Sequence, residues 1–192
     1  MFKRSFMMFV VFVGVAFLAF ADESQEKKMK ATAIADEIIN MRSSLAKTFI
    51  KPDIQITEET FKSVCGAVGK RVKEISEREG IKIRHAATKN RNPMNATMAG
   101  EAEILSKFEK DKNLKEIWDI YEENVVGNGY YRYYSYIKPI FVEETCLACH
   151  GAKDKRPQFV IDKYPADKAY DFKVRDLRGM ISIMIPITGE QK

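Results

Sequence analysis

Two cysteines and a histidine within five residues constrain this chain more than any other feature of its sequence. Cys146, Cys149 and His150 lie in the segment ETCLACHG, residues 144–151. Cys-x-x-Cys-His is the attachment motif of c-type haem, in which each thiol adds to one vinyl group and the histidine becomes the proximal iron ligand. The two vinyl groups lie on adjacent pyrroles of one rigid ring, so the thiols must be held a short distance apart. The motif therefore predicts one covalently attached haem c, bound by Cys146 and Cys149 with His150 on the iron.

Other uses of paired cysteines fit the sequence less well. A thioredoxin-like redox pair lies at the start of a helix in a βαβ unit, and it would leave His150 and the third cysteine, Cys65, unexplained. A structural zinc site needs four nitrogen or sulfur ligands, whereas the chain has three cysteines and two histidines that are scattered along it. Three cysteines also cannot all pair within one chain, and a bridge between Cys146 and Cys149 would close only a tiny loop.

The second axial ligand is left open by the sequence alone. A thiolate would stabilise ferric iron and lower the reduction potential, whereas a methionine would raise it. A single cysteine or methionine on an apolar stripe is also a common packing residue. The candidates are Cys65, His85, Met94, Met98, Met180 and Met184.

The first 21 residues have the pattern of a secretory signal peptide. Lys3 and Arg4 form a basic start, residues 6–20 are apolar, and Ala19-Phe20-Ala21 is a small-x-small cleavage site. The apolar run is short for a membrane span, which needs roughly 20 apolar residues. We therefore expect cleavage after Ala21 and a periplasmic protein that comprises residues 22–192, with no membrane span in the mature chain.

The charge balance gives no indication of nucleic-acid binding. The net charge of +5 falls to +3 when Lys3 and Arg4, two positive charges, leave with the signal peptide. No basic run with interleaved aromatic residues occurs, so we expect no nucleic-acid partner and interpret the charges as a solvated surface.

Three amphipathic helices are predicted from the spacing of apolar residues. The first runs from Ala31 to Phe49, before Pro52. The second begins near Thr57, a typical N-cap residue, and ends at Gly80, with Cys65 at the edge of its buried face. The third is predicted over residues 100–121, where the apolar positions are Ile104, Leu105, Phe108, Leu114, Ile117, Trp118 and Tyr121.

Three further segments favour β-strands. Residues 81–87, IKIRHAA, and residues 180–187, MISIMIPI, alternate in polarity or are rich in β-branched residues, and residues 130–141, YYRYYSYIKPIF, follow a predicted turn at Gly127-Asn128-Gly129. In TKNRNPMN, residues 88–95, Pro93 biases Asn92 away from helix. We therefore predict an α+β fold in which long N-terminal helices precede a mostly antiparallel sheet.

Four segments, in this order, resemble the PAS-like c-type haem domain family. They are VCGAV at 64–68, ATKNRNPMN at 87–95, the tyrosine-rich strand followed by CLACHG at 146–151, and YPADKAYDFKVRDLRGMISIMIPI at 164–187. Members of this family are exported single-haem proteins, long catalogued as a domain of unknown function, that occur alone and as sensory modules of histidine kinases and chemoreceptors. The resemblance covers essentially the whole mature chain.

The resemblance implies a PAS-like sheet that carries the haem, with Cys146 and Cys149 as attachment points and His150 and Cys65 as iron ligands. The Arg91-Asn92-Pro93 turn resembles the family's loop near the haem pocket. Arg91 and Asn92 are therefore expected to contact the cofactor, with Arg91 either pairing with a haem propionate or stabilising the turn. His85 is expected to be a strand histidine, because the family has no ligand there.

The predicted function is that of a periplasmic monohaem c-type cytochrome that senses redox state or a diatomic gas, carbon monoxide or nitric oxide. In this hypothesis the Cys65 thiolate binds ferric iron and leaves after reduction, which repositions its helix for an unidentified redox or signalling partner. The alternative is a soluble electron-transfer cytochrome c in which nothing moves. No distal base and arginine of a haem peroxidase are evident, so we expect no enzymatic activity.

Overall fold

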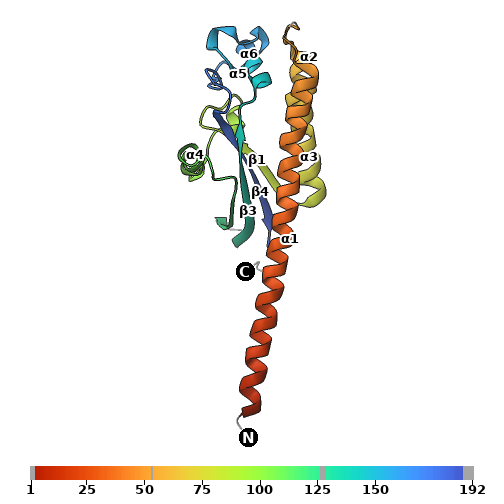
Figure 1. Cartoon of the computed structure of the whole chain (residues 1–192), viewed down its shortest axis with the longest axis vertical. Coiled ribbons are helices and arrows are strands. Elements are labelled where there is room, and N and C mark those ends of the chain that lie inside the picture. Colours follow the sequence, from red (N-terminus) through yellow and green to blue (C-terminus); the bar gives the residue numbers. More distant parts are fainter. Residues whose placement is uncertain (1–2, 53, 126–128, 188–192) are drawn as a thin grey trace.

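The central feature of the fold is an antiparallel sheet of four strands with helices on both faces (Figure 1). The computed structural model describes residues 3–52, 54–125 and 129–187, with side chains from residue 22 onward. The strand order is β1-β4-β3-β2. The strands span Lys82–Ala86 (β1), Ile117–Val125 (β2), Gly129–Phe141 (β3) and Leu177–Pro186 (β4). The predicted α+β class is confirmed.

A long helix, α1 (Lys3–Phe49), covers one face of the sheet, and its N-terminal part extends beyond the sheet (Figure 1). The predicted helix from Ala31 to Phe49 is confirmed and begins earlier than predicted. Four of its buried residues, Ala31, Ile34, Ala35 and Ile38, follow the i, i+3, i+4, i+7 spacing of an apolar stripe. They pack against Tyr134, Tyr136, Ile181 and Ile183 of the sheet. The predicted signal peptide falls on the part of α1 whose side chains are not described, so export stays a prediction.

The second predicted helix is confirmed but consists of three parts. They are α2 (Glu58–Phe61), a π-helical turn at Lys62–Gly66, and α3 (Ala67–Glu79). Thr57 caps the start, because its hydroxyl accepts a hydrogen bond from the Thr60 N–H at 3.2 Å. Gly80 ends α3 in the left-handed conformation, with φ of 62°, which glycine adopts without steric cost. The π-helical turn, which contains Cys65, was not predicted.

The third predicted helix is wrong in its second half. Helix α4 spans only Glu101–Lys110 and covers the other face of the sheet, whereas residues 117–121 belong to β2 (Figure 1). The apolar spacing is already interrupted between Phe108 and Leu114, and Asp111 turns the chain, because its carboxylate accepts the Asn113 N–H at 2.9 Å. Pairing with β3 then outweighs helix propensity, since it places Trp118 in a stacked contact with Tyr134, with ring centroids 5.4 Å apart.

The remaining strand predictions are confirmed. Alternation along β3 and β4 directs Tyr134, Tyr136, Ile181 and Ile183 toward α1, and Ile137 and Met180 toward α4. The predicted turn at Gly127 and Asn128 lies outside the described residues, and Gly129 begins β3. Short elements connect β3 to β4: α5 (Leu147–His150), α6 (Gln158–Lys163) and 3₁₀ turns at Glu144–Cys146 and Lys153–Lys155. Another 3₁₀ turn, at Pro93–Asn95, lies between β1 and α4.

The helices were also compared with the requirements of a membrane span. Of those in the described part of the chain, none combines the length and the apolar content that crossing a bilayer requires.

Candidate functional site

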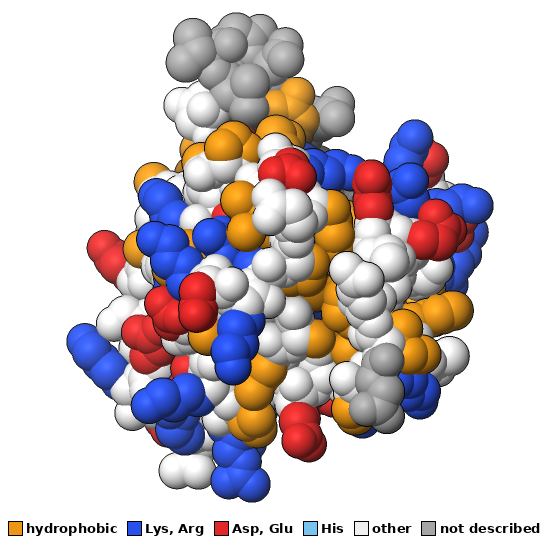
Figure 2. Space-filling model, turned by 90° about the horizontal axis from the view of Figure 1, so that it is seen from above, with side chains coloured by type: hydrophobic (Ala, Val, Ile, Leu, Met, Phe, Trp, Pro, Cys, Tyr) orange, Lys and Arg blue, Asp and Glu red, His pale blue; other side chains and the backbone are white. Residues whose placement is uncertain are grey.

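A cavity of about 610 Å³ lies between α1, the π-helical turn with α3, strand β1 and the cysteine motif. Its volume falls within the range of roughly 300–1,000 Å³ that is typical of cofactor sites. Cys65, His85, Cys146 and His150 all line it, although they are far apart in the sequence. Figure 2 shows the end of the molecule that carries α5 and α6, where hydrophobic side chains are visible in the middle and charged side chains lie mainly toward the edge.

His150 is held in the orientation and tautomer that an iron ligand requires. Its Nδ1 lies 2.7 Å from the carbonyl oxygen of Ala169. A carbonyl only accepts hydrogen bonds, so Nδ1 carries the hydrogen and Nε2 keeps its lone pair. The ring also packs edge-on against Phe172, with centroids 6.2 Å apart. Burial, and then the charges of Arg178 and Arg91, hold the pKa of His150 well below its usual range, so the imidazole is neutral.

All three cysteines are free thiols. Burial raises the pKa of Cys149 to about 11. Cys65 is accessible because it faces the cavity, but the protein around the cavity excludes most water, so this desolvation raises the pKa of Cys65 as well. The positive charges of Arg42, Arg91 and Arg178 oppose that rise and favour an anionic sulfur. Cys146 lines the cavity beside His150, whereas Cys149 is not among the lining residues.

The helix surface next to Cys65 leaves room for a planar ring. Gly66 and Gly69 line the cavity, and a Cβ on Gly69 would have no heavy atom within 4 Å. Two glycines thus flatten the wall from which Cys65 projects. A covalently attached haem fits this cavity because His150 is neutral, two free thiols lie on one short segment, and the helix surface beside Cys65 is open.

Arg91 ties the cysteine motif to two other loops. Its Nη2 donates to the carbonyl oxygen of Cys149 at 2.6 Å and to that of Ala169 at 3.3 Å, and its Nε lies 3.4 Å from the Asp167 carboxylate. Arg91 is buried, and these contacts join separate loops rather than stabilising its own turn at the surface. Propionate pairing by Arg91 stays a prediction. Asn92 lines the cavity, and its Oδ1 accepts the Met94 N–H at 3.0 Å, which closes the 3₁₀ turn.

Only some of the other predicted ligand candidates line the cavity. His85, Met94 and Met180 line the cavity, whereas Met98 and Met184 do not. The Nε2 of His85 accepts a hydrogen bond from Arg42 at 2.9 Å, and burial, followed by the charges of Arg42 and Arg178, lowers the pKa of His85 to about 3. The lone pair of His85 is therefore already used, as expected for a strand histidine.

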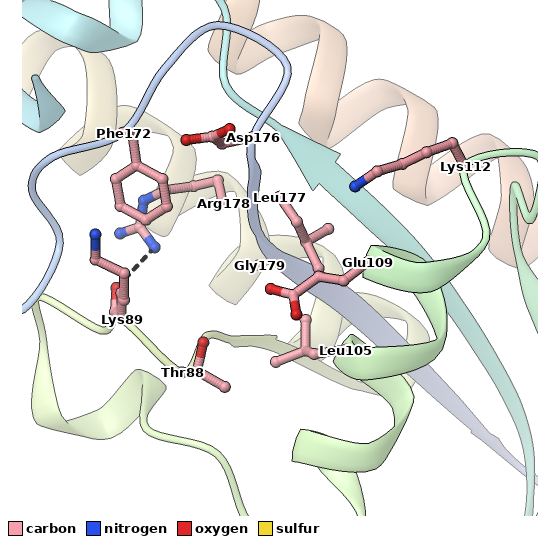
Figure 3. Close-up of a pocket in the computed structure, with 10 residues that line it drawn as sticks. All are labelled: Thr88, Lys89, Leu105, Glu109, Lys112, Phe172, Asp176, Leu177, Arg178 and Gly179. Carbon is pink, nitrogen blue, oxygen red and sulfur yellow. Dashed lines mark hydrogen bonds between the residues drawn. The ribbon is translucent and has the colours of Figure 1, made fainter.

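Two lining residues, Arg42 and Arg178, were missed by the sequence reasoning. Arg42 follows Ile38 by four positions on the buried stripe of α1, and a charge at such a position was the available signal. Arg178 also borders a second cavity of about 310 Å³, which faces α4 (Figure 3). Across the described ranges, no three His, Cys, Asp or Glu side chains are grouped so that they could hold a metal ion.

Comparison with known proteins identifies similar chains. A family model described as Tll0287-like matches residues 21–186. Among solved structures, the chain is similar to the cyanobacterial heme-protein Tll0287, with a TM-score of 0.69 and 37% sequence identity over 87% of this chain and 98% of that chain. No curated protein matches it.

Proposed function

The chain belongs to the Tll0287-like family, and on that premise we propose that it is a periplasmic haem protein with one haem c attached to Cys146 and Cys149. The observation that carries the proposal is the hydrogen bond from His150 Nδ1 to the Ala169 carbonyl oxygen, inside a cavity that Cys146 also lines. It leaves Nε2 as the ligand atom in the way that protein second-sphere contacts orient metal-binding histidines. The similar solved structure is that of a haem protein, which supports the same cofactor here.

Cys65 is the proposed second ligand of the iron. It lies on a different element from His150 but lines the same cavity. It also lies on a π-helical turn, a distortion that occurs often at functional sites. Burial raises the pKa of the Cys65 thiol, and the positive charges of three arginines around its sulfur partly offset that rise.

The proposed role is sensing of redox state or of a diatomic gas, carbon monoxide or nitric oxide, rather than catalysis. When bound, the haem supplies an iron that changes its charge by one electron and binds such gases. Cys65 would hold the ferric iron as a thiolate, and reduction, which removes the charge that favours the anion, would allow release of Cys65 with a proton taken up from solvent at Sγ. The π-helical turn contacts α1, so this release changes the packing of the long helix that a partner protein could contact.

Haem attachment is tested by producing the full chain in a host that matures c-type cytochromes. The exported protein should start at Asp22 and carry the mass of one haem that resists extraction with acid and organic solvent. Replacement of both Cys146 and Cys149 by serine should abolish that covalent mass. A colourless wild-type product of unmodified mass would contradict the proposal.

The ligand set and the sensor role are tested by magnetic resonance and gas-binding spectra. Ferric wild type should give a low-spin thiolate spectrum that Cys65→Ser removes, and His85→Gln, a control in the same cavity, should retain it. Reduced wild type should bind carbon monoxide. If Cys65→Ser leaves the spectrum unchanged and the reduced protein never binds the gas, the chain is better explained as an electron-transfer cytochrome c.

A further inference from the structure

Five formally charged side chains line the large cavity, and three of them have partners of opposite charge. Arg84 pairs with Glu101 at 3.0 Å, and Glu143 pairs with Lys47 at 3.3 Å. Arg91 faces Asp167 at 3.4 Å. Arg42 and Arg178 complete the set, and neither forms an ion pair with a carboxylate in the described part of the chain.

Arg42 enters the cavity from α1. One hydrogen bond is recorded for it among the described residues, from Nη2 to His85 Nε2 at 2.9 Å. A guanidinium has five N–H donors, so most of those on Arg42 are available to a ligand. Because His85 is neutral, it cannot balance the charge of Arg42.

Arg178 enters the same cavity from the start of β4. Its Nη1 donates to the carbonyl oxygen of Lys89 at 3.2 Å, the contact drawn in Figure 3, and its guanidinium lies 5.5 Å from the ring centre of Phe172. Both contacts orient the side chain without neutralising it. Lys89, whose backbone carbonyl oxygen accepts this hydrogen bond, carries a positive side chain and so provides no counter-charge.

Two enclosed guanidinium groups without anionic partners are costly, because burial of an uncompensated charge is strongly unfavourable. Burial lowers the pKa of Arg178 to about 10, the charges of Arg91 and Arg42 add to the effect, and the charges of Asp167 and Cys65 only partly oppose it. Burial lowers the pKa of Arg42 as well. The cavity therefore holds two guanidinium groups that no carboxylate of the described residues contacts as an ion pair, and their free donors lie on two different walls.

We propose that Arg42 and Arg178 bind the two propionate carboxylates of the haem. This assignment rests on the proposed function, because it takes haem as the occupant of the cavity. A haem has two propionates, one for each of these guanidinium groups and opposite to them in charge, and guanidinium groups form charge-assisted hydrogen bonds with carboxylates. Arg91 is then a scaffold residue, since its donors already bind the Cys149 and Ala169 carbonyl groups.

The test follows propionate protonation in the haem-loaded full chain. The propionate carboxyl carbons are labelled with ¹³C, and their infrared bands are recorded as the pH is lowered. A neighbouring arginine lowers a carboxyl pKa by roughly 1–3 units. Arg42→Gln and Arg178→Gln should therefore each raise the protonation pH of one propionate by about 1–2 units. The corresponding Arg→Lys variants keep the charge, so they should return the protonation pH most of the way to its wild-type value.

Two further variants make the comparison specific. Arg78→Gln removes a charge whose side chain is 58% exposed and pairs with Glu79 away from the cavity, so both propionate bands should stay as in wild type. Arg91→Gln should lower the unfolding midpoint and leave the bands unchanged. A shift caused by Arg91→Gln but by neither Arg42→Gln nor Arg178→Gln would overturn the assignment.

A second outcome would also overturn it. If both proposed variants leave the propionate bands unchanged but weaken the thiolate spectrum, the two arginines serve Cys65 instead. These results differ from failure of the proposed function, in which the wild-type chain itself carries no covalent haem.

Discussion

Gly151 limits what can follow the haem-binding histidine. A Cβ at this position would lie 2.6 Å from the backbone carbonyl oxygen of Leu147, which cannot move aside without disturbing α5. We expect Gly151→Ala to lower the free energy of unfolding by about 1–3 kcal/mol and to reduce the attached-haem fraction. Urea titration and haem absorbance measure both. Gly69→Ala is the matched control for stability in the haem-free chain, because its Cβ meets no atom within 4 Å, and it should leave the unfolding midpoint unchanged or raise it.

Asp167 holds together the loops behind the cysteine motif. Its side chain is 0% exposed, and its carboxylate accepts from Arg156 at 3.0 Å and from the Ala169 N–H at 2.8 Å, beside Arg91. Asp167→Asn leaves Arg91 without its counter-charge, so we expect a loss of about 3–5 kcal/mol in unfolding free energy. Asp162→Asn, at an exposed site where the carboxylate accepts only from Gln158, serves as the control. A loss at Asp167 no larger than that of an exposed pair would show that the network is not structurally required.

Some residues of the site could be predicted from the sequence, and others could not. Cys146, Cys149 and His150 were accessible to prediction because their chemistry depends on spacing along five residues of chain. The partner of His150 was not, because Ala169 contributes only a backbone carbonyl that the loop folds back to present. Arg178 is similar, since its place in the cavity depends on the pairing of β4 with β1.

Among the elements, the segment from α2 to α3 positions Cys65 and depends on its N-terminal cap. The Thr57 hydroxyl accepts the Thr60 N–H at 3.2 Å, and the Thr60 hydroxyl accepts the Thr57 N–H at 3.4 Å. Thr57→Ala should lower the unfolding free energy by about 1 kcal/mol and speed amide hydrogen exchange in α2. Thr48→Ala, which removes an exposed hydroxyl bonded within α1, should change neither quantity appreciably. Unchanged exchange in α2 after Thr57→Ala would contradict a role for the cap.

Local signals explain which elements were predicted correctly. Thr57 and Gly80 mark the ends of a helix by their own chemistry, so the boundaries of that segment were predicted to within a residue. Residues 117–121 carry no such mark, and their aromatic and β-branched side chains suit a helix stripe or a strand until β3 is beside them. The π-helical turn at Cys65 has no sequence signal of its own, because it needs one extra residue that neighbouring packing must accommodate.

For the molecule as a whole, His85 makes stability depend on pH. Its folded pKa of about 3 lies below the ordinary value near 6.5, so protonation favours the unfolded chain. Its contribution is complete above about pH 6.5 and is lost as the pH falls from there toward about 3, at up to about 1.4 kcal/mol per pH unit. The glutamine in His85→Gln can still accept a hydrogen bond from Arg42 but does not titrate. In urea titrations across this pH range, the unfolding free energy of this variant should therefore fall less steeply than that of wild type. Parallel curves for the two proteins would contradict the assignment.

The attachment of α1 to the sheet determines how much of the N-terminal region the fold requires. Among the residues from 22 onward, whose side chains are described, the core contacts of α1 begin at Ala31, and Ser24, Lys28 and Lys30 before it make polar contacts. We therefore expect a chain that starts at residue 22, the predicted mature N-terminus, to fold cooperatively in urea titrations. A chain that starts at residue 31 should lose no more than about 1–2 kcal/mol, because it gives up only half-exposed polar pairs.

We expect the opposite result, loss of cooperative folding, for a chain that starts at residue 39. It lacks Ala31, Ile34, Ala35 and Ile38, so Tyr134, Tyr136, Ile181 and Ile183 lose the helix that covers them. Truncation of even one large core side chain costs roughly 2–5 kcal/mol, and a small domain has only about 5–15 kcal/mol in total. This chain should therefore show no cooperative unfolding transition by circular dichroism. If it unfolds as cooperatively as the chain from residue 22, the sheet is stable without α1. A signal that passes from Cys65 through α1 would then leave the rest of the fold undisturbed.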